Sequence, residues 1–141
     1  MKPKILLRVA TGFILFFVLG HTMGHFTWKQ TTDPKKQVII KMMDENEFEF
    51  GGAMKSIGEN HEGYSWLLIF SLLAFAMLTW VISGLTEKDS KASVNLLIPV
   101  FACFFAFAII CYLFFFLVPA ATCLLASMLM LISILQLKKV S

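Results

Sequence analysis

The sequence predicts an all-α protein: an integral membrane four-helix bundle with a short amphipathic helix in its first extracytoplasmic loop. Of the 141 residues, 58% are hydrophobic and only 15% are charged, whereas soluble domains carry about 25% charged residues. A soluble fold of this length exposes too much surface to hide so many apolar side chains. The apolar residues also form runs long enough for spanning helices, which need about 20 residues. We therefore expect one transmembrane domain over residues 1–141.

The first expected span covers residues 5–26, and Lys2, Lys4 and Arg8 precede or open it. A basic start followed by an apolar centre is also the pattern of a signal peptide. The far end of the run, residues 20–25, reads Gly-His-Thr-Met-Gly-His and lacks a small-x-small cleavage site. We therefore expect this segment to be retained as a span.

The second expected span covers residues 64–85, with Tyr64 and Trp66 at one end and Trp80 near the other. This placement fits the preference of aromatic side chains for both membrane interfaces. The chain then has no charged residue from Val94 to Leu137.

A continuous helix over that uncharged stretch would reach roughly 65 Å, about twice the hydrocarbon thickness. It must therefore fold back, and Pro119 favours a break just before it, because proline disfavours helix in the preceding residue. We expect a third span over 94–116 and a fourth over 119–137, joined as an antiparallel hairpin.

The first loop, residues 27–63, contains the predicted amphipathic helix. Asp33 suits the N-cap position and Pro34 the first helical position. Val38, Ile39, Met42 and Met43 then recur at helical spacing. This helix is expected to lie on the membrane surface or over the bundle, and the alternative is a groove for a partner. Gly51 and Gly52 are expected to break the chain before a second short apolar piece.

Basic residues predict the orientation, because short cytoplasmic flanks are rich in Lys and Arg. With four spans, three basic flanks fall on one side, which places both termini in the cytoplasm. These flanks are the amino end (Lys2, Lys4 and Arg8), the loop between the second and third spans (Lys88 and Lys91) and the carboxyl end (Lys138 and Lys139). The first loop also carries lysines, interleaved with acidic residues, and these lysines act against this assignment.

The net charge of +3 is small, and the basic residues lie at the ends of the segments. The expected partner is therefore a lipid bilayer and not nucleic acid. The cysteines (Cys103, Cys111 and Cys123) lie inside apolar runs and are interpreted as small embedded side chains.

The candidate site is a group of polar residues at the outer ends of the first two spans. His21 and His25 are one helical turn apart, so they share a face, and His61 lies just before the second span between Glu59 and Glu62. Imidazole and carboxylate groups are suitable ligands for zinc, iron or copper, and histidine pairs also hold haem. The five residues are therefore candidate metal or haem ligands. Interfacial packing and hydrogen bonding is the simpler interpretation, and proton transfer or substrate binding is a third.

Glycines at helical spacing mark another face of the first span. Gly20 and Gly24 form a G-x-x-x-G pair, and Gly12 lies two turns earlier. Small residues let helices approach closely in lipid. The stripe predicts helix packing within the bundle, with homodimerisation through the Gly20 and Gly24 face as the alternative.

The segment Gly20–His25, written Gly-His-Thr-x-Gly-His, resembles an uncharacterised group of small four-helix bacterial membrane proteins, and the layout is loosely similar to DoxX-like proteins. The resemblance implies a bacterial inner membrane location. The chain shows no recognisable catalytic set, which favours a non-catalytic membrane subunit or accessory protein. A membrane oxidoreductase or metal- or haem-binding protein using the histidines is the alternative. A permease is disfavoured, because spans two to four lack titratable side chains in their central portions.

Overall fold

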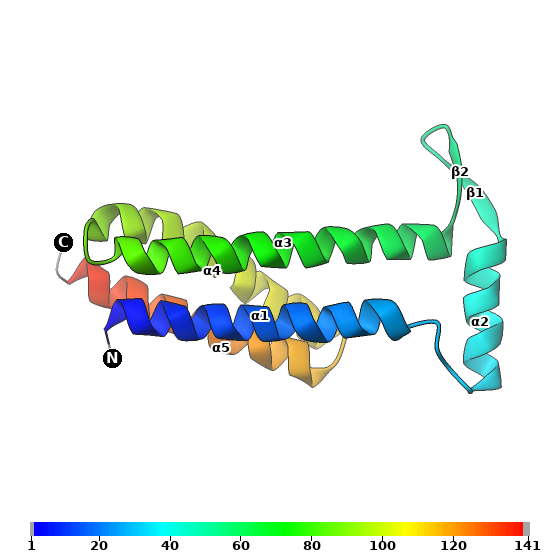
Figure 1. The fold of residues 1–141 in the computed structure, drawn as a ribbon, viewed down its shortest axis with the longest axis horizontal. Helices are drawn as coiled ribbons and strands as arrows, with labels where there is room; N and C mark the ends of the chain where they lie inside the picture. The colour runs from blue at the N-terminus through cyan, green and yellow to red at the C-terminus, as the bar shows by residue number, and fades with distance from the viewer. Residues whose placement is uncertain (1, 140–141) are drawn as a thin grey trace. The chain divides into compact units, whose positions relative to one another are not determined.

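The computed structural model describes residues 2–139. The described chain is mainly helical, with one short hairpin (Figure 1). In chain order the elements are α1 (Pro3–Thr27), α2 (Pro34–Glu45), β1 (Glu47–Phe50), β2 (Ala53–Ser56), α3 (Ile57–Leu85), α4 (Ser90–Phe114) and α5 (Leu117–Lys138).

Four of these helices, α1, α3, α4 and α5, are long and apolar enough to cross a membrane. They correspond to the four spans expected from the sequence. That they form a bundle inside a bilayer stays a prediction. Pro119 lies in the first turn of α5, and the chain reverses just before it at residues 115–116.

The first loop contains the predicted helix. The Asp33 carboxylate accepts a hydrogen bond from the backbone amide of Lys35 at 3.0 Å, and Pro34 begins α2. This confirms Asp33 as the N-cap, the residue whose side chain binds the otherwise unpaired amides of the first turn.

Where the sequence suggested a break and an apolar piece, the structure has a β-hairpin. Strands β1 and β2 pair antiparallel, with Glu47 opposite Ser56 and Phe50 opposite Ala53. Gly51 and Gly52 form the turn at φ +58° and +88°. Two consecutive residues with positive φ are typical of the tight hairpin turns that match strand twist, and glycine adopts them without steric cost.

Helix α3 begins at Ile57, well before the predicted start of the second span, because Ser56 and Glu59 form a capping box. The Ser56 hydroxyl accepts from the Glu59 amide at 3.0 Å, and the Glu59 carboxylate accepts from the Ser56 amide at 2.9 Å. This reciprocal pairing stabilises a helix start at Ser-x-x-Glu. The motif is legible in the sequence as Ser-Ile-Gly-Glu.

The described chain divides into two compact units: residues 19–71 form one, and the residues before and after that range form the other. The second of these contains α4, α5, the first part of α1 and the last part of α3. Buried side chains in it come from all four helices, including Leu7, Ile14, Leu72, Leu97, Phe104 and Met130. At one end Lys4 donates to Glu87 at 2.6 Å. This hydrogen bond holds the pKa of Glu87 below its usual value.

Buried hydroxyl groups in this unit are satisfied within their own helices. Each donates to a backbone carbonyl three or four residues earlier, as for Thr79, Ser83, Ser93, Thr122, Ser127 and Ser133. Serine and threonine commonly use this local bond when they lie inside helices. These side chains therefore need no partner from a neighbouring helix, and they let helices approach closely.

Candidate functional site

The candidate site lies entirely within residues 19–71, where the end of α1, the start of α3 and helix α2 come together. His21 on α1 and Ser65 on α3 share a hydrogen bond, with His21 Nε2 3.1 Å from Ser65 Oγ; its direction depends on the imidazole tautomer. Ser65 is buried. This bond therefore joins the two helices through polar side chains that face each other.

His25, one turn further along α1, lies among aromatic rings. Its imidazole meets Trp66 edge-on with centroids 4.5 Å apart, and Phe26 with centroids 5.0 Å apart. Trp66 in turn stacks on Phe70 at 6.0 Å. The His25 Nδ1 atom is buried and has no hydrogen-bond partner among the described residues, which is unusual because buried polar atoms normally find one.

His61 on α3 packs against Trp28, the residue that follows α1. The two ring centroids are 4.6 Å apart and the planes are tilted by 31°. The Lys29 ammonium also lies over the Trp28 ring, 4.9 Å from its centroid, a distance at which a cation is attracted to the aromatic face. Trp28 therefore contacts an imidazole and an ammonium group at once.

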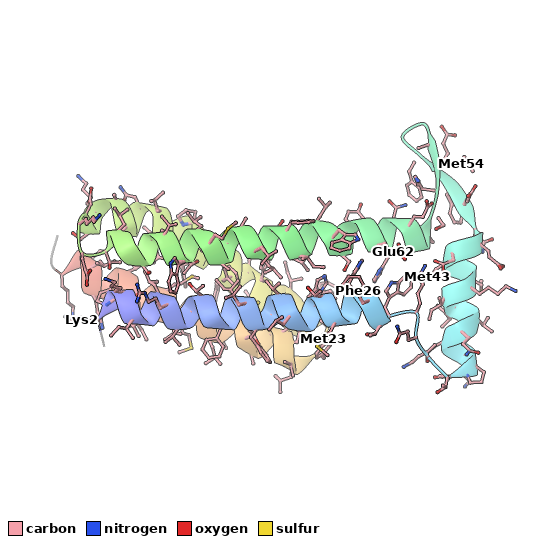
Figure 2. The ribbon with its side chains drawn as sticks, viewed as in Figure 1. Lys2, Met23, Phe26, Met43, Met54 and Glu62 are labelled. Atoms are coloured by element: carbon pink, nitrogen blue, oxygen red, sulfur yellow. The ribbon has the colours of Figure 1, made fainter. Side chains whose placement is uncertain are left out.

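Lys29 also joins α2 to α3 through two carboxylates. Its Nζ atom lies 2.8 Å from Asp44 in the last turn of α2 and 2.9 Å from Glu62 in α3. The hydrogen bond to Asp44 is the largest cause of a raised pKa at Lys29, followed by that to Glu62. Figure 2 shows Glu62 and Met43 at the same end of this unit, close to Phe26. We call α2 and the β1–β2 hairpin the cap.

Gly58, in the first turn of α3, allows Asp44 to approach. A Cβ atom at this position would overlap the Asp44 carboxylate and come within 3.4 Å of the Met43 carbonyl oxygen. The carboxylate therefore lies close to the amino end of α3, where the helix dipole favours negative charge. This position of Asp44 also brings it within reach of Lys29.

Most of the predicted ligands have partners of another kind, and the Nδ1 atom of His25 is the exception among the described residues. Glu59 caps α3 and pairs with Lys55 at 3.0 Å, and Glu62 pairs with Lys29. His25 and His61 each lie close enough to His21 to interact with it electrostatically. His21 also contacts Ser65, His25 contacts Trp66, and His61 contacts Trp28. Over residues 2–139, no group of three or more His, Cys, Asp or Glu side chains is arranged to hold a metal ion.

Among residues 2–139, the glycine stripe of α1 leaves open space where side chains would be. A Cβ atom built at Gly12, Gly20 or Gly24 would find nothing within 4 Å, and all three glycines are exposed. The described residues therefore give no sign of the expected packing of another helix on this stripe. The homodimer alternative requires such an open surface.

No known protein family, curated protein or solved structure matches the chain. The resemblance to small bacterial membrane proteins stays a prediction that rests on residues 20–25.

Proposed function

We propose that this chain is a multi-pass protein of a bacterial inner membrane, with both termini in the cytoplasm and the cap outside. Four helices that are long and apolar enough to cross a membrane support a multi-pass membrane protein. Large apolar side chains such as Met77, Val81 and Leu113 are also exposed by more than half, as suits contact with lipid. The Lys4–Glu87 ion pair supports the orientation, because it brings two basic flanks to the same end.

Within that membrane the chain acts as a non-catalytic subunit or accessory protein that presents its cap to another envelope protein. The observation that carries this proposal is that α2 is held in place by ion pairs while its apolar side chains stay exposed. Ion pairs of Lys29 tether α2 to α3, yet Val38, Ile39 and Met42 remain 57–60% exposed. Exposed apolar groups beside charges are typical of protein interaction surfaces.

Native gel electrophoresis of detergent-extracted membranes tests this role. Wild-type chain is expected to migrate in a complex larger than the chain alone. The triple variant V38S/I39S/M42S should migrate as the uncomplexed chain, because it removes only the exposed apolar groups of α2. The matched control K36S/K41S changes exposed polar positions of the same helix and should keep the complex. Equal migration of all three proteins would contradict the proposal.

A second candidate function is binding of a metal ion or haem through His21 and His25. The unpartnered Nδ1 atom of His25 favours it, because a ligand would satisfy that nitrogen. An absorption spectrum and metal analysis of detergent-purified protein test the idea beside the double variant H21A/H25A. Stoichiometric metal or a haem band that the variant lacks would support it. A colourless, metal-free wild type would exclude it.

A further inference from the structure

Two of the three cysteines lie side by side. Cys111 in the last turn of α4 and Cys123 in the second turn of α5 are both buried between helices that pack on each other, and their thiols are close enough to interact. No local sequence pattern predicts this contact, because the two residues form no C-x-x-C motif and lie in different helices. The contact comes from the way the α4–α5 hairpin folds.

Both helices of the hairpin carry small buried side chains. Ala108 on α4 and Ala120 and Ala126 on α5 are all buried. Small residues at a helix interface let two backbones come together in lipid. The chain reverses over residues 115–116, so the last turn of α4 and the first turns of α5 lie beside the same connection.

Cys103 cannot take the place of either partner. It lies on α4, eight residues before Cys111, which corresponds to about 12 Å along the helix axis. A disulfide needs Cα atoms no more than about 7 Å apart. The pairing is therefore specific to Cys111 and Cys123, and Cys103 remains as an internal control.

We propose that Cys111 and Cys123 form an intramolecular disulfide bond that fastens α4 to α5 beside their turn. The oxidant is a small disulfide compound. The Cys111 thiolate attacks one sulfur of that compound, so a mixed disulfide forms and the first thiol leaves. The Cys123 thiolate then attacks Cys111 Sγ and displaces the second thiol. Two S–H bonds are lost, one Sγ–Sγ bond forms, and the disulfide compound is reduced to two thiols.

The location suits such a bond. If the topology proposed above holds, the α4–α5 turn faces the outer side of the membrane, where disulfides form and persist. Cys111 is the attacking thiol because it is nearer the turn and slightly more exposed, at 6% against 0% for Cys123. The bond closes a short loop, so it restricts the separation of the two helices in the unfolded chain.

The test treats membranes that contain the full chain with dipyridyl disulfide, then denatures the protein and counts thiols with a large maleimide. Wild type should change from three labelled cysteines to one, or to none where Cys103 carries a reagent adduct, and peptide mass spectrometry should find Cys111 linked to Cys123. C103S should change from two to none through the same link. C111S and C123S should each fail to give a linked peptide, carrying reagent adducts or free thiols instead.

Three labelled cysteines in oxidised wild type, a link that includes Cys103, or links only between chains would overturn the proposal. The reagent crosses membranes, so the result does not depend on which side the turn faces. A wrong topology and a disulfide that does not form therefore give different results and can be distinguished.

Discussion

The Lys29 ammonium lies 2.8 Å from the Asp44 carboxylate and thereby ties the chain that follows α1 to the last turn of α2. The same ammonium reaches Glu62 on α3 at 2.9 Å. Because one side chain joins the ends of three helices, removing its charge is expected to loosen the cap.

Lys29→Met should raise the rate of amide hydrogen exchange across α2. An exposed ion pair contributes up to about 1 kcal/mol, which corresponds to roughly fivefold faster exchange per pair. Lys36→Met, at an exposed position of α2, should leave exchange unchanged. Equal effects of the two variants would show that Lys29 does not hold the cap.

The titration of Lys29 gives a second test. Hydrogen bonds to Asp44 and Glu62 raise the pKa of Lys29 above that of an ordinary lysine. Its contribution to stability is therefore fully present below the unfolded-state pKa and is lost as the pH rises through the higher folded-state pKa. NMR of labelled lysine side chains should find Lys29 titrating above the ordinary pKa of lysine, and Asp44→Asn should lower the pKa of Lys29. A Lys29 with the ordinary pKa would show that the ion pairs do not persist in solution.

Gly58→Ala should displace Asp44 and weaken its pairing with Lys29, because the new methyl group would overlap the carboxylate. The expected result is faster exchange in α2, similar to that of Lys29→Met. Gly63→Ala is the matched control in the same helix, since a methyl group there meets nothing within 4 Å. If both alanines behave alike, the change reflects helix propensity and not the approach of Asp44.

Substitutions of Glu59 separate capping from metal binding. Glu59→Ala should fray the first turn of α3, because it removes the carboxylate that accepts from the Ser56 amide. Glu59→Gln should keep the turn, because glutamine also completes a capping box. Amide exchange at residues 57–61 measures the difference. A glutamine variant that frays as much as the alanine variant would exclude this explanation.

The open glycine stripe predicts a dimer. In cross-linking of intact membranes, wild type should give a band at twice the mass of the chain, and G20I/G24I should lose it, because larger side chains keep helices apart. Leu19→Ile is the control on the same helix. A band that survives in G20I/G24I would place the contact elsewhere.

Much of the fold could be predicted from the sequence. Long apolar runs predict the four long helices, and the Asp33–Pro34 pair predicts the start of α2. Both predictions succeed because spanning length and helix capping are local properties. The hairpin was missed although Glu47–Phe50 alternates polar and apolar residues, since Gly51 and Gly52 were interpreted only as a break. The contact of His25 with Trp66 and that of Cys111 with Cys123 depend on the register between helices, which no local pattern specifies.

The proposed orientation puts the cap outside the membrane and the α3–α4 connection inside. In a variant without native cysteines, Thr32→Cys marks the exposed segment before α2, and Lys88→Cys marks the α3–α4 connection. A membrane-impermeant maleimide applied to cells with a permeable outer membrane should label Thr32→Cys directly and Lys88→Cys only after the inner membrane is opened. Labelling of Lys88→Cys in intact cells, with Thr32→Cys protected, would contradict the account.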